Sequence, residues 1–221
     1  MNLRTATPAI RAVLFDFGGV ILSSPFDAFT RFEGVHGLPD GFLRAVNARD
    51  PHNNAWARLE RGEIDIAEFG TCFAAEALQL GREVDGREVL SLLGGEVRPQ
   101  MVEVVRRCRT RFITGLLTNN FLSDPEVLGE RFGPRAPEID EALSYFDFVI
   151  ESSKVGIRKP EPKFYELACQ TIGIEPGEAV FLDDLGMNLK PARAMGMRTI
   201  KVESPPQAIR QLEALLDITL A

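Results

Sequence analysis

The feature that most constrains the fold is a short run of apolar residues, Ala12 to Phe15, which ends in an aspartate. The run shows no alternation of polar and apolar residues, which is typical of a strand buried on both faces. Asp16 follows directly, and Gly18 and Gly19 allow the backbone to turn tightly or to approach a ligand. Because ligands bind at the carboxyl ends of strands in open α/β sheets, the run predicts a central parallel strand with a carboxylate at a binding edge.

The second half of the chain alternates apolar runs with helical patterns. We expect strands at residues 112–117, 146–150, 179–182 and 199–202. We expect helices between them, at residues 101–109, 162–173, 188–196 and 207–216. Residues 123–141 contain three prolines and are expected to be irregular. Strands separated by helices indicate an α/β fold with a doubly wound parallel sheet and right-handed crossovers.

Residues 25–95 have a different pattern, because apolar residues recur there at helical spacing and no buried-strand run appears. Asp65 and Glu68 have the spacing of a helix-capping box. We therefore predict a helical cap domain over 25–95, inserted after the first strand. The α/β core is then formed by residues 1–24 and 96–221.

Composition limits the partners and the compartment. The net charge of -7 over 221 residues argues against a nucleic-acid or acidic-membrane surface as the main partner. The three cysteines form no CxxC pair, which suggests reduced thiols in a cytoplasmic protein. The two histidines lack zinc-type spacing, and we expect neither a signal core in residues 1–10 nor a segment that spans a bilayer.

Three of the predicted strands end in polar groups. They are Asp16, the pair Thr118 and Asn119, and the pair Asp183 and Asp184. The carboxyl ends of parallel strands share one edge of the sheet, so these groups can converge there. Asparagine, threonine and aspartate also cap turns, but three such ends together favour a site.

The charges of such a site need a counterion. Asp16, Asp183 and Asp184 would place three negative charges in one cleft, and like charges at close range raise one another's pKa. Mg²⁺ suits carboxylates combined with waters and substrate oxygens. Lys159, just before a predicted helix, can supply one more positive charge. The charges then cancel, and such a site can accept a phosphate group.

Four short motifs in this sequence fall in the order of those of the haloacid dehalogenase-like (HAD) hydrolase superfamily, which the chain resembles. They are Asp16–Val20, Leu116–Asn120, Gly156–Pro160 and Phe181–Asn188. The family has a Rossmann-like core and carries a helical cap where residues 25–95 lie here. The segment Val149–Pro162, together with Phe181–Arg193, more closely resembles the N-terminal phosphatase domain of soluble epoxide hydrolase and the related N-terminal domain of some acyl-CoA dehydrogenase family proteins. We expect that domain to stand alone in this chain.

The resemblance implies an Mg²⁺-dependent phosphatase that acts on a small phosphorylated metabolite. Asp16 would be the nucleophile that forms an aspartyl-phosphate. Thr118 and Asn119 would hydrogen-bond the transferring phosphoryl group, and Lys159 would hold the nucleophile and the phosphate oxygens in place.

The resemblance also implies the ligands of the metal. Asp16, Asp184 and the backbone carbonyl of Gly18 would bind Mg²⁺, with Asp183 as a further ligand or an outer partner. The metal would neutralise phosphate charge and align the attack.

Gly18 departs from the family pattern, because phosphatases of this family usually carry a second aspartate there. That aspartate protonates the leaving group and later activates water, and the loss of such catalysis typically costs about 10²–10⁴-fold. Two alternatives therefore stay open. One is a 2-haloacid dehalogenase, which would use Asp16 on carbon without a metal, and the other is a non-catalytic binding or regulatory module.

Substrate choice is expected to lie in the cap. His52, Asn53, Asn54 and Trp56 are the cap residues that could contact a substrate, although a turn for the asparagines and a place in the cap core for Trp56 are the simpler interpretations. Exposed apolar surface on the cap would support a homodimer, but the sequence does not show the oligomeric state.

Overall fold

The core of the protein is a five-stranded parallel sheet in the order β3-β2-β1-β4-β5. It is seen in a computed structural model that describes residues 8–119 and 133–220. The strands are β1 (Ala12–Phe15), β2 (Ile113–Thr118), β3 (Phe148–Glu151), β4 (Ala179–Asp183) and β5 (Arg198–Lys201). All five predicted strands and the doubly wound α/β class are confirmed, with bounds that differ by at most two residues.

Strand β1 lies at the centre of the sheet, and its four side chains are all fully buried. Phe15 is in register with Leu116 of β2 and with Leu182 of β4. The backbone N–H of Asp16 donates to the carbonyl of Leu182 at 2.8 Å. This register brings the ends of three strands, with their polar residues, to one edge of the sheet.

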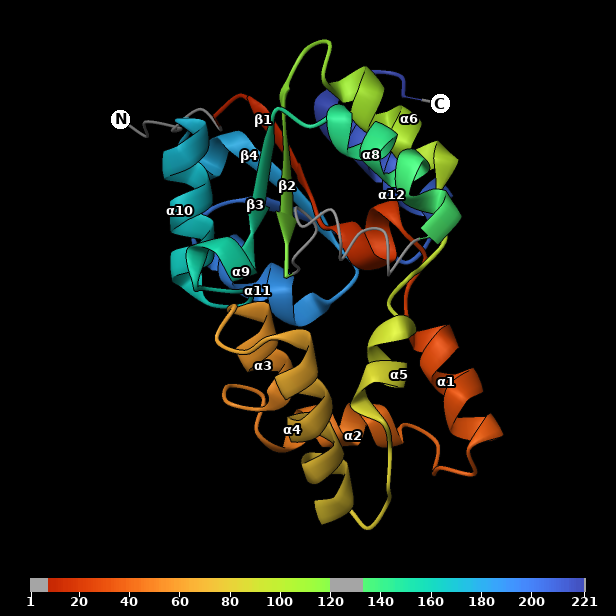
Figure 1. Ribbon diagram of the computed structural model, residues 1–221. Helices are drawn as coiled ribbons and strands as arrows, with labels where there is room; N and C mark the ends of the chain where they lie inside the picture. The colour runs from red at the N-terminus through yellow and green to blue at the C-terminus, as the bar shows by residue number, and fades with distance from the viewer. Residues whose placement is uncertain (1–7, 120–132, 221) are drawn as a thin grey trace.

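The two faces of the sheet pack against different helices (Figure 1). Val13 and Phe15 belong to one apolar cluster, whereas Ala12 and Leu14 belong to the other. The first cluster includes residues of α6 (Pro99–Cys108), α8 (Ala136–Ser144) and α12 (Pro205–Leu216). The second includes residues of α10 (Pro162–Ile172) and α11 (Gly186–Ala194). Short turns of helix complete the core: α9 (Ser152–Val155), η2 (Gly133–Arg135) and η3 (Pro176–Glu178).

Helix α8 corrects the expectation that residues 123–141 are irregular. The chain is helical from Ala136, and Pro137 lies in the first turn, where a proline costs no helical hydrogen bond. Residues 123–132 lie outside the described residues.

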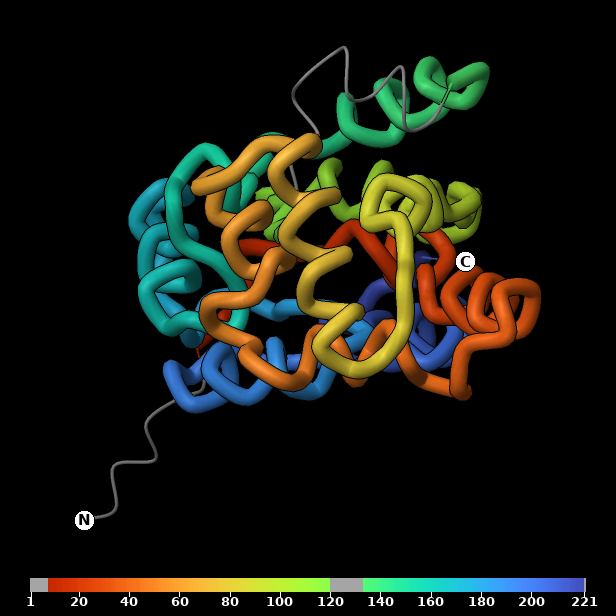
Figure 2. The backbone as a smooth tube through the Cα atoms, turned by 60° about the horizontal axis from the view of Figure 1, so that its bottom comes forward, coloured from red at the N-terminus to blue at the C-terminus, as the bar shows by residue number. Residues whose placement is uncertain are grey.

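Five α-helices lie in the segment between β1 and α6. They are α1 (Phe26–Val35), α2 (Phe42–Arg49), α3 (Ala55–Glu60), α4 (Ile66–Gln79) and α5 (Gly86–Ser91). Asp65 and Glu68 form the predicted capping box at the start of α4. The helices share a hydrophobic cluster of their own, and in Figure 2 they lie in front of one edge of the sheet. The division of the chain into a core and a cap stays a prediction. The cap is residues 25–95, and the core is residues 1–24 and 96–221.

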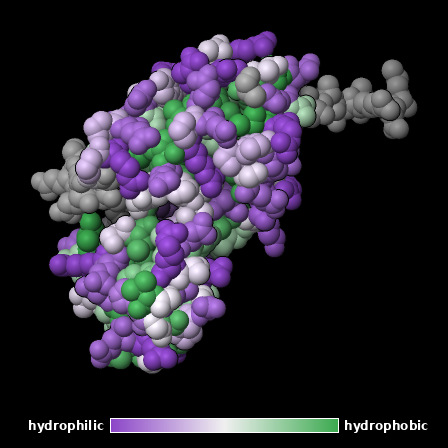
Figure 3. Space-filling view, turned by 90° about the vertical axis from the view of Figure 1, so that its right-hand side faces the viewer, coloured by the Kyte–Doolittle hydropathy of each residue, from purple (hydrophilic) through white to green (hydrophobic). Residues whose placement is uncertain are grey.

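The surface in Figure 3 is mostly hydrophilic with scattered apolar side chains. Val35 and Leu78, both on cap helices, are exposed over 82% and 58% of their surface. A homodimer through the cap stays a prediction. Within the described ranges, none of the helices has the length and apolar character needed to cross a membrane.

Candidate active site

The three predicted aspartates lie together at the carboxyl edge of the sheet. Asp16, Asp183 and Asp184 each offer a carboxylate oxygen, and these atoms lie within 4.8 Å of one another. A cavity of about 160 Å³ opens beside them. Its walls include six of the seven predicted site residues: Asp16, Gly18, Thr118, Asn119, Lys159 and Asp184.

Lys159 joins two of the carboxylates. Its Nζ lies 2.7 Å from Oδ1 of Asp16 and 2.8 Å from Oδ2 of Asp183. The lysine side chain is only 1% exposed, so its charge is compensated by these two partners rather than by water. Burial alone would lower the pKa of Lys159, but the two carboxylates outweigh burial and raise it. The lysine therefore stays charged.

Asp183 is the predicted residue that does not line the cavity. Its Oδ1 accepts hydrogen bonds from the Leu185 N–H at 2.8 Å and from Asn188 Nδ2 at 3.1 Å. Its Oδ2 accepts from Lys159 Nζ and from Asn188 Nδ2 at 3.0 Å. Because both oxygens are occupied and the side chain is fully buried, Asp183 positions its neighbours. Its neighbour Asp184 is only partly buried and faces the cavity.

Burial and mutual repulsion make the cavity carboxylates hard to ionise. Burial raises the pKa of Asp16 to about 8; Lys159 opposes the shift, while Asp183 and Asp184 add to it. Burial also raises the pKa of Asp184 to about 6, again with a contribution from Asp183. Lys159 thus leaves part of the negative charge uncompensated, and a bound cation would remove that cost.

The two glycines after Asp16 differ in what they permit. Gly19 has φ +77°, and a Cβ there would overlap the carboxylate of Asp184. Gly18 has an ordinary φ of -68°, and a Cβ there would meet nothing within 4 Å. The turn η1 (Phe17–Ile21) therefore requires glycine at position 19 but leaves room for a side chain at position 18.

Asn119 fixes the loop that carries Lys159. Its Oδ1 accepts from the backbone N–H of Lys159 at 2.8 Å, and its Nδ2 donates to the carbonyl of Lys159 at 2.9 Å. Thr118, 2% exposed, ends β2 beside it. The sequence predicted phosphate contacts for both residues, and the structure adds this hydrogen-bonding role for Asn119.

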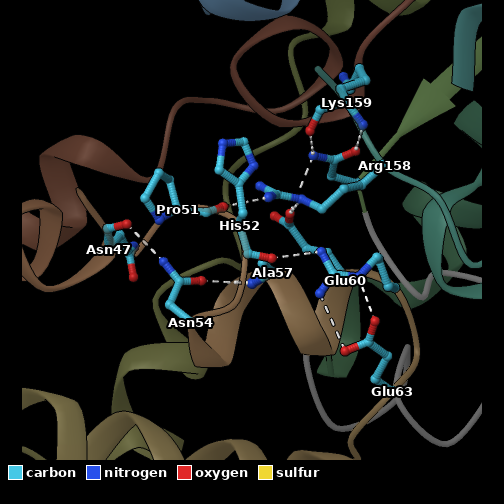
Figure 4. A network of polar contacts seen from close by, with 11 residues as sticks. Asn47, Pro51, His52, Asn54, Ala57, Glu60, Glu63, Arg158 and Lys159 are labelled. Atoms are coloured by element: carbon cyan, nitrogen blue, oxygen red, sulfur yellow. Dashed lines mark hydrogen bonds and ion pairs between the residues drawn. The ribbon is translucent and has the colours of Figure 1, made fainter. Parts of the chain in front are cut away.

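Sequence reasoning missed Glu60 and Arg158, which connect the cap to the core (Figure 4). Glu60 ends α3, lines the cavity and accepts a hydrogen bond from Asn119 Nδ2 at 3.2 Å. Arg158 forms an ion pair with Glu60 and donates to the carbonyl of Pro51 at 2.9 Å. Arg158 lies in the recognised motif beside Lys159, but no periodicity or spacing distinguishes Glu60.

Of the four cap residues considered from the sequence, Trp56 lines the cavity. It also packs edge-on against Phe69 in the cap core, as expected. Asn54 caps α3 by accepting from the Ala57 N–H at 2.8 Å, which agrees with the simpler interpretation. Asn53 hydrogen-bonds Asp50 in the preceding turn, and His52 is not among the residues that line this cavity.

A sequence profile of haloacid dehalogenase-like hydrolases matches residues 10–196, which is most of the chain. The chain belongs to the haloacid dehalogenase-like hydrolase family. The predicted resemblance to this family is therefore confirmed.

Curated relatives include domains of larger proteins and a separate phosphatase. The chain is 42% identical to rat bifunctional epoxide hydrolase 2 over 93% of its own length and 38% of that protein. It is 37% identical to mouse acyl-CoA dehydrogenase family member 10 over 95% of the chain and 19% of that protein. A D-ribitol-5-phosphate phosphatase of Bacteroides thetaiotaomicron is 25% identical over 94% of the chain and 99% of that enzyme. The chain thus spans well under half of the first two relatives.

Solved structures of the family share the fold. A HAD family enzyme from Bacteroides thetaiotaomicron, in complex with magnesium and inorganic phosphate, matches 87% of this chain and 94% of its own with a TM-score of 0.60 and 20% identity. L-2-haloacid dehalogenase from Xanthobacter autotrophicus matches 96% of this chain and 84% of its own, also with a TM-score of 0.60 and 20% identity. Both kinds of enzyme share this architecture, so the fold alone does not distinguish attack on the phosphorus of a phosphate ester from attack on the carbon of a haloacid.

Proposed function

We propose that this chain is a phosphomonoester phosphatase that forms an aspartyl-phosphate on Asp16. The hydrogen bonding of that carboxylate carries the proposal. Oδ1 accepts from the Phe17 N–H at 2.7 Å and from Lys159 Nζ. Among the described residues, Oδ2 has no hydrogen-bond partner, and Asp16 lines the cavity. One oxygen is thereby held in place while the other is available to attack.

The surrounding residues suit a phosphoryl group. Lys159 supplies a buried positive charge beside the nucleophile, which favours the charge of the transferring group. Thr118 brings a hydroxyl to the cavity wall, and Asn119 holds the Lys159 loop while facing the same space. The relatives named as phosphatases agree with this assignment.

The donor set fits Mg²⁺. Asp16 and Asp184 offer hard carboxylate oxygens at the cavity, and burial, together with the neighbouring carboxylates, raises the pKa of both groups, a cost that a bound cation would offset. These two residues would hold the metal, with the Gly18 carbonyl as a third protein ligand and Asp183 as the residue that orients the site. When bound, the metal would neutralise phosphate charge.

Gly18 favours a second candidate, a HAD-fold module that binds ligands without turnover. A glycine at this position has no side chain that could act as a general acid or base. The 2-haloacid dehalogenase alternative is disfavoured because the close carboxylate set is a metal-type arrangement, which a carbon-directed attack would not need.

A phosphatase assay separates these functions. We would measure phosphate release from 4-nitrophenyl phosphate and a panel of small phosphorylated metabolites, with Mg²⁺ or with EDTA. Wild type would be compared with Asp16→Asn and with the exposed control Asp140→Asn. Turnover that needs both Mg²⁺ and Asp16 supports the proposal. Mg²⁺ binding without turnover on any compound would favour the binding module, and halide release from 2-haloacids without metal would favour the dehalogenase.

A further inference from the structure

Release of an aliphatic alcohol from a phosphomonoester requires a proton, because an alkoxide is a poor leaving group. The donor has to line the cavity where the ester is bound. Gly18 has no side chain to do so. The described residues that line the cavity include four ionisable groups: Asp16, Glu60, Lys159 and Asp184.

Three of these four have other tasks in the proposed function, on which this inference rests. Asp16 attacks phosphorus, and Asp184 faces the cavity as the metal-binding carboxylate. Lys159 is 1% exposed and holds its proton between two carboxylates. Glu60 is the remaining carboxyl group, and it comes from the cap rather than from the core.

The geometry of Glu60 suits proton transfer. Its Oε2 is held by the ion pair with Arg158 and by the hydrogen bond from Asn119 Nδ2. Among the described residues, its Oε1 has no hydrogen-bond partner. The side chain is 17% exposed and lines the cavity. One oxygen is thus anchored, and the other is left for a leaving group or a water.

We propose that Glu60 is the catalytic acid and base of this enzyme, in place of the side chain that Gly18 lacks. Burial favours the protonated form of its carboxyl group and raises the pKa of Glu60, although Arg158, Lys159 and Arg61 oppose the shift. Raised pKa values suit a group that must both donate and accept a proton near neutral pH.

The two chemical steps balance with Glu60 in this role. In the first, Asp16 Oδ2 forms a bond to phosphorus, the bond between phosphorus and the ester oxygen breaks, and Glu60 donates its proton to that oxygen. In the second, ionised Glu60 takes a proton from water while the water oxygen bonds to phosphorus. The bond between phosphorus and Asp16 then breaks, which releases phosphate and regenerates both carboxyl groups.

The test compares leaving groups in the full chain with Mg²⁺. In Glu60→Gln, we expect kcat for a substrate with an aliphatic leaving group to fall by about 10²-fold or more. 4-Nitrophenolate leaves without a proton near neutral pH, so its first release should survive. Because the second step still lacks its base, 4-nitrophenol should appear as a burst of about one equivalent per enzyme followed by slow turnover.

Three further variants separate proton transfer from structure. Arg158→Gln breaks the same ion pair but keeps the carboxyl group, so its effect should be similar for both leaving groups and should show no burst. Glu63→Gln removes a half-exposed cap carboxylate of the same network and should behave as wild type. Gly18→Asp in the Glu60→Gln background should restore turnover of the aliphatic substrate, since position 18 has room for a side chain.

An equal loss on both substrates in Glu60→Gln, without a burst and matched by Arg158→Gln, would overturn the proposal and leave Glu60 as a structural contact. Normal turnover of both substrates by Glu60→Gln would overturn it as well. Either result leaves the Asp16-dependent phosphatase intact. Absence of turnover in the wild type with Mg²⁺ would instead overturn the proposed function, and this inference with it.

Discussion

The two walls of the cavity are built differently. On the core wall, Lys159 is almost fully buried. It pairs with Asp183, which lies outside the cavity lining and has both oxygens hydrogen-bonded. On the cap wall, Glu60 is only partly buried and keeps one oxygen without a described partner. Trp56 Nε1, also from the cap, is buried without a described partner. The core wall is thus held by a buried ion-pair network that leaves Asp16 Oδ2 facing the cavity, whereas the polar atoms of the cap wall are held by fewer and more exposed contacts.

The largest effect should come from the core wall. Lys159→Ala leaves Asp16 and Asp183 buried without their counter-charge, and breaking a buried pair typically costs about 3–5 kcal/mol of the free energy of unfolding. Urea denaturation at neutral pH would measure it. The control Lys201→Ala removes a pair between exposed side chains and should change stability by less than about 1 kcal/mol. A small effect of Lys159→Ala would contradict the buried pairing of Lys159 with the two carboxylates.

The adjacent glycines provide a matched pair of substitutions. Gly19→Ala places a side chain in the left-handed region and against Asp184, so we expect a loss of about 1–3 kcal/mol and weaker Mg²⁺ binding. Gly18→Ala meets no neighbouring atom and should change stability by less than about 1 kcal/mol. Thermal unfolding and metal titration of both variants would check this, and equal effects would refute the distinction.

Metal binding should depend on pH in a defined direction. Asp184 and Asp16 have pKa values raised to about 6 and about 8, and only their ionised forms ligate a cation. Mg²⁺ affinity should therefore rise as the pH increases through this range, with release of protons. Without metal, the stability that these raised pKa values contribute is present at acid pH and is lost as the pH rises.

Calorimetric titration in buffers of different ionisation enthalpy would detect the released protons. Asp184→Asn should bind Mg²⁺ much more weakly than the wild type, because it lacks one of the carboxylate ligands. Normal binding by that variant, or affinity that is independent of pH, would contradict the assignment of the metal ligands.

The smallest effect should come from the cap wall. Arg158→Gln removes a partly buried ion pair and a hydrogen bond to Pro51, which is expected to cost about 1.5 kcal/mol. Arg106→Gln, which breaks an exposed pair with Glu103, should leave the stability close to that of the wild type, because water screens such a pair. Denaturant unfolding would compare them. A loss for Arg158→Gln as large as that for Lys159→Ala would mean that the two walls are equally tight.

The same contrast explains what the sequence could predict. Short apolar runs predict buried strands, and the polar residues that follow each run mark where the strand ends. Because parallel strands bring those ends to one edge of the sheet, the site residues of the core could be predicted without a structure. The different roles of Asp183 and Asp184 could not, because they depend on which way each side chain turns. Glu60 ends a six-residue helix, and its position depends on how the cap folds back over the sheet. Helix α8 was missed because its proline lies in the first turn, where it is tolerated.

The central claim is that Asp16 forms a covalent bond to phosphorus. The most direct measurement is rapid acid quenching of the enzyme during turnover of a phosphomonoester with Mg²⁺, followed by mass spectrometry of the peptide that contains Asp16. We predict the added mass of one phosphoryl group on that residue, lost on treatment with hydroxylamine and absent in Asp16→Asn. Sustained turnover by Asp16→Asn, or a phosphoryl group on another residue, would contradict the account.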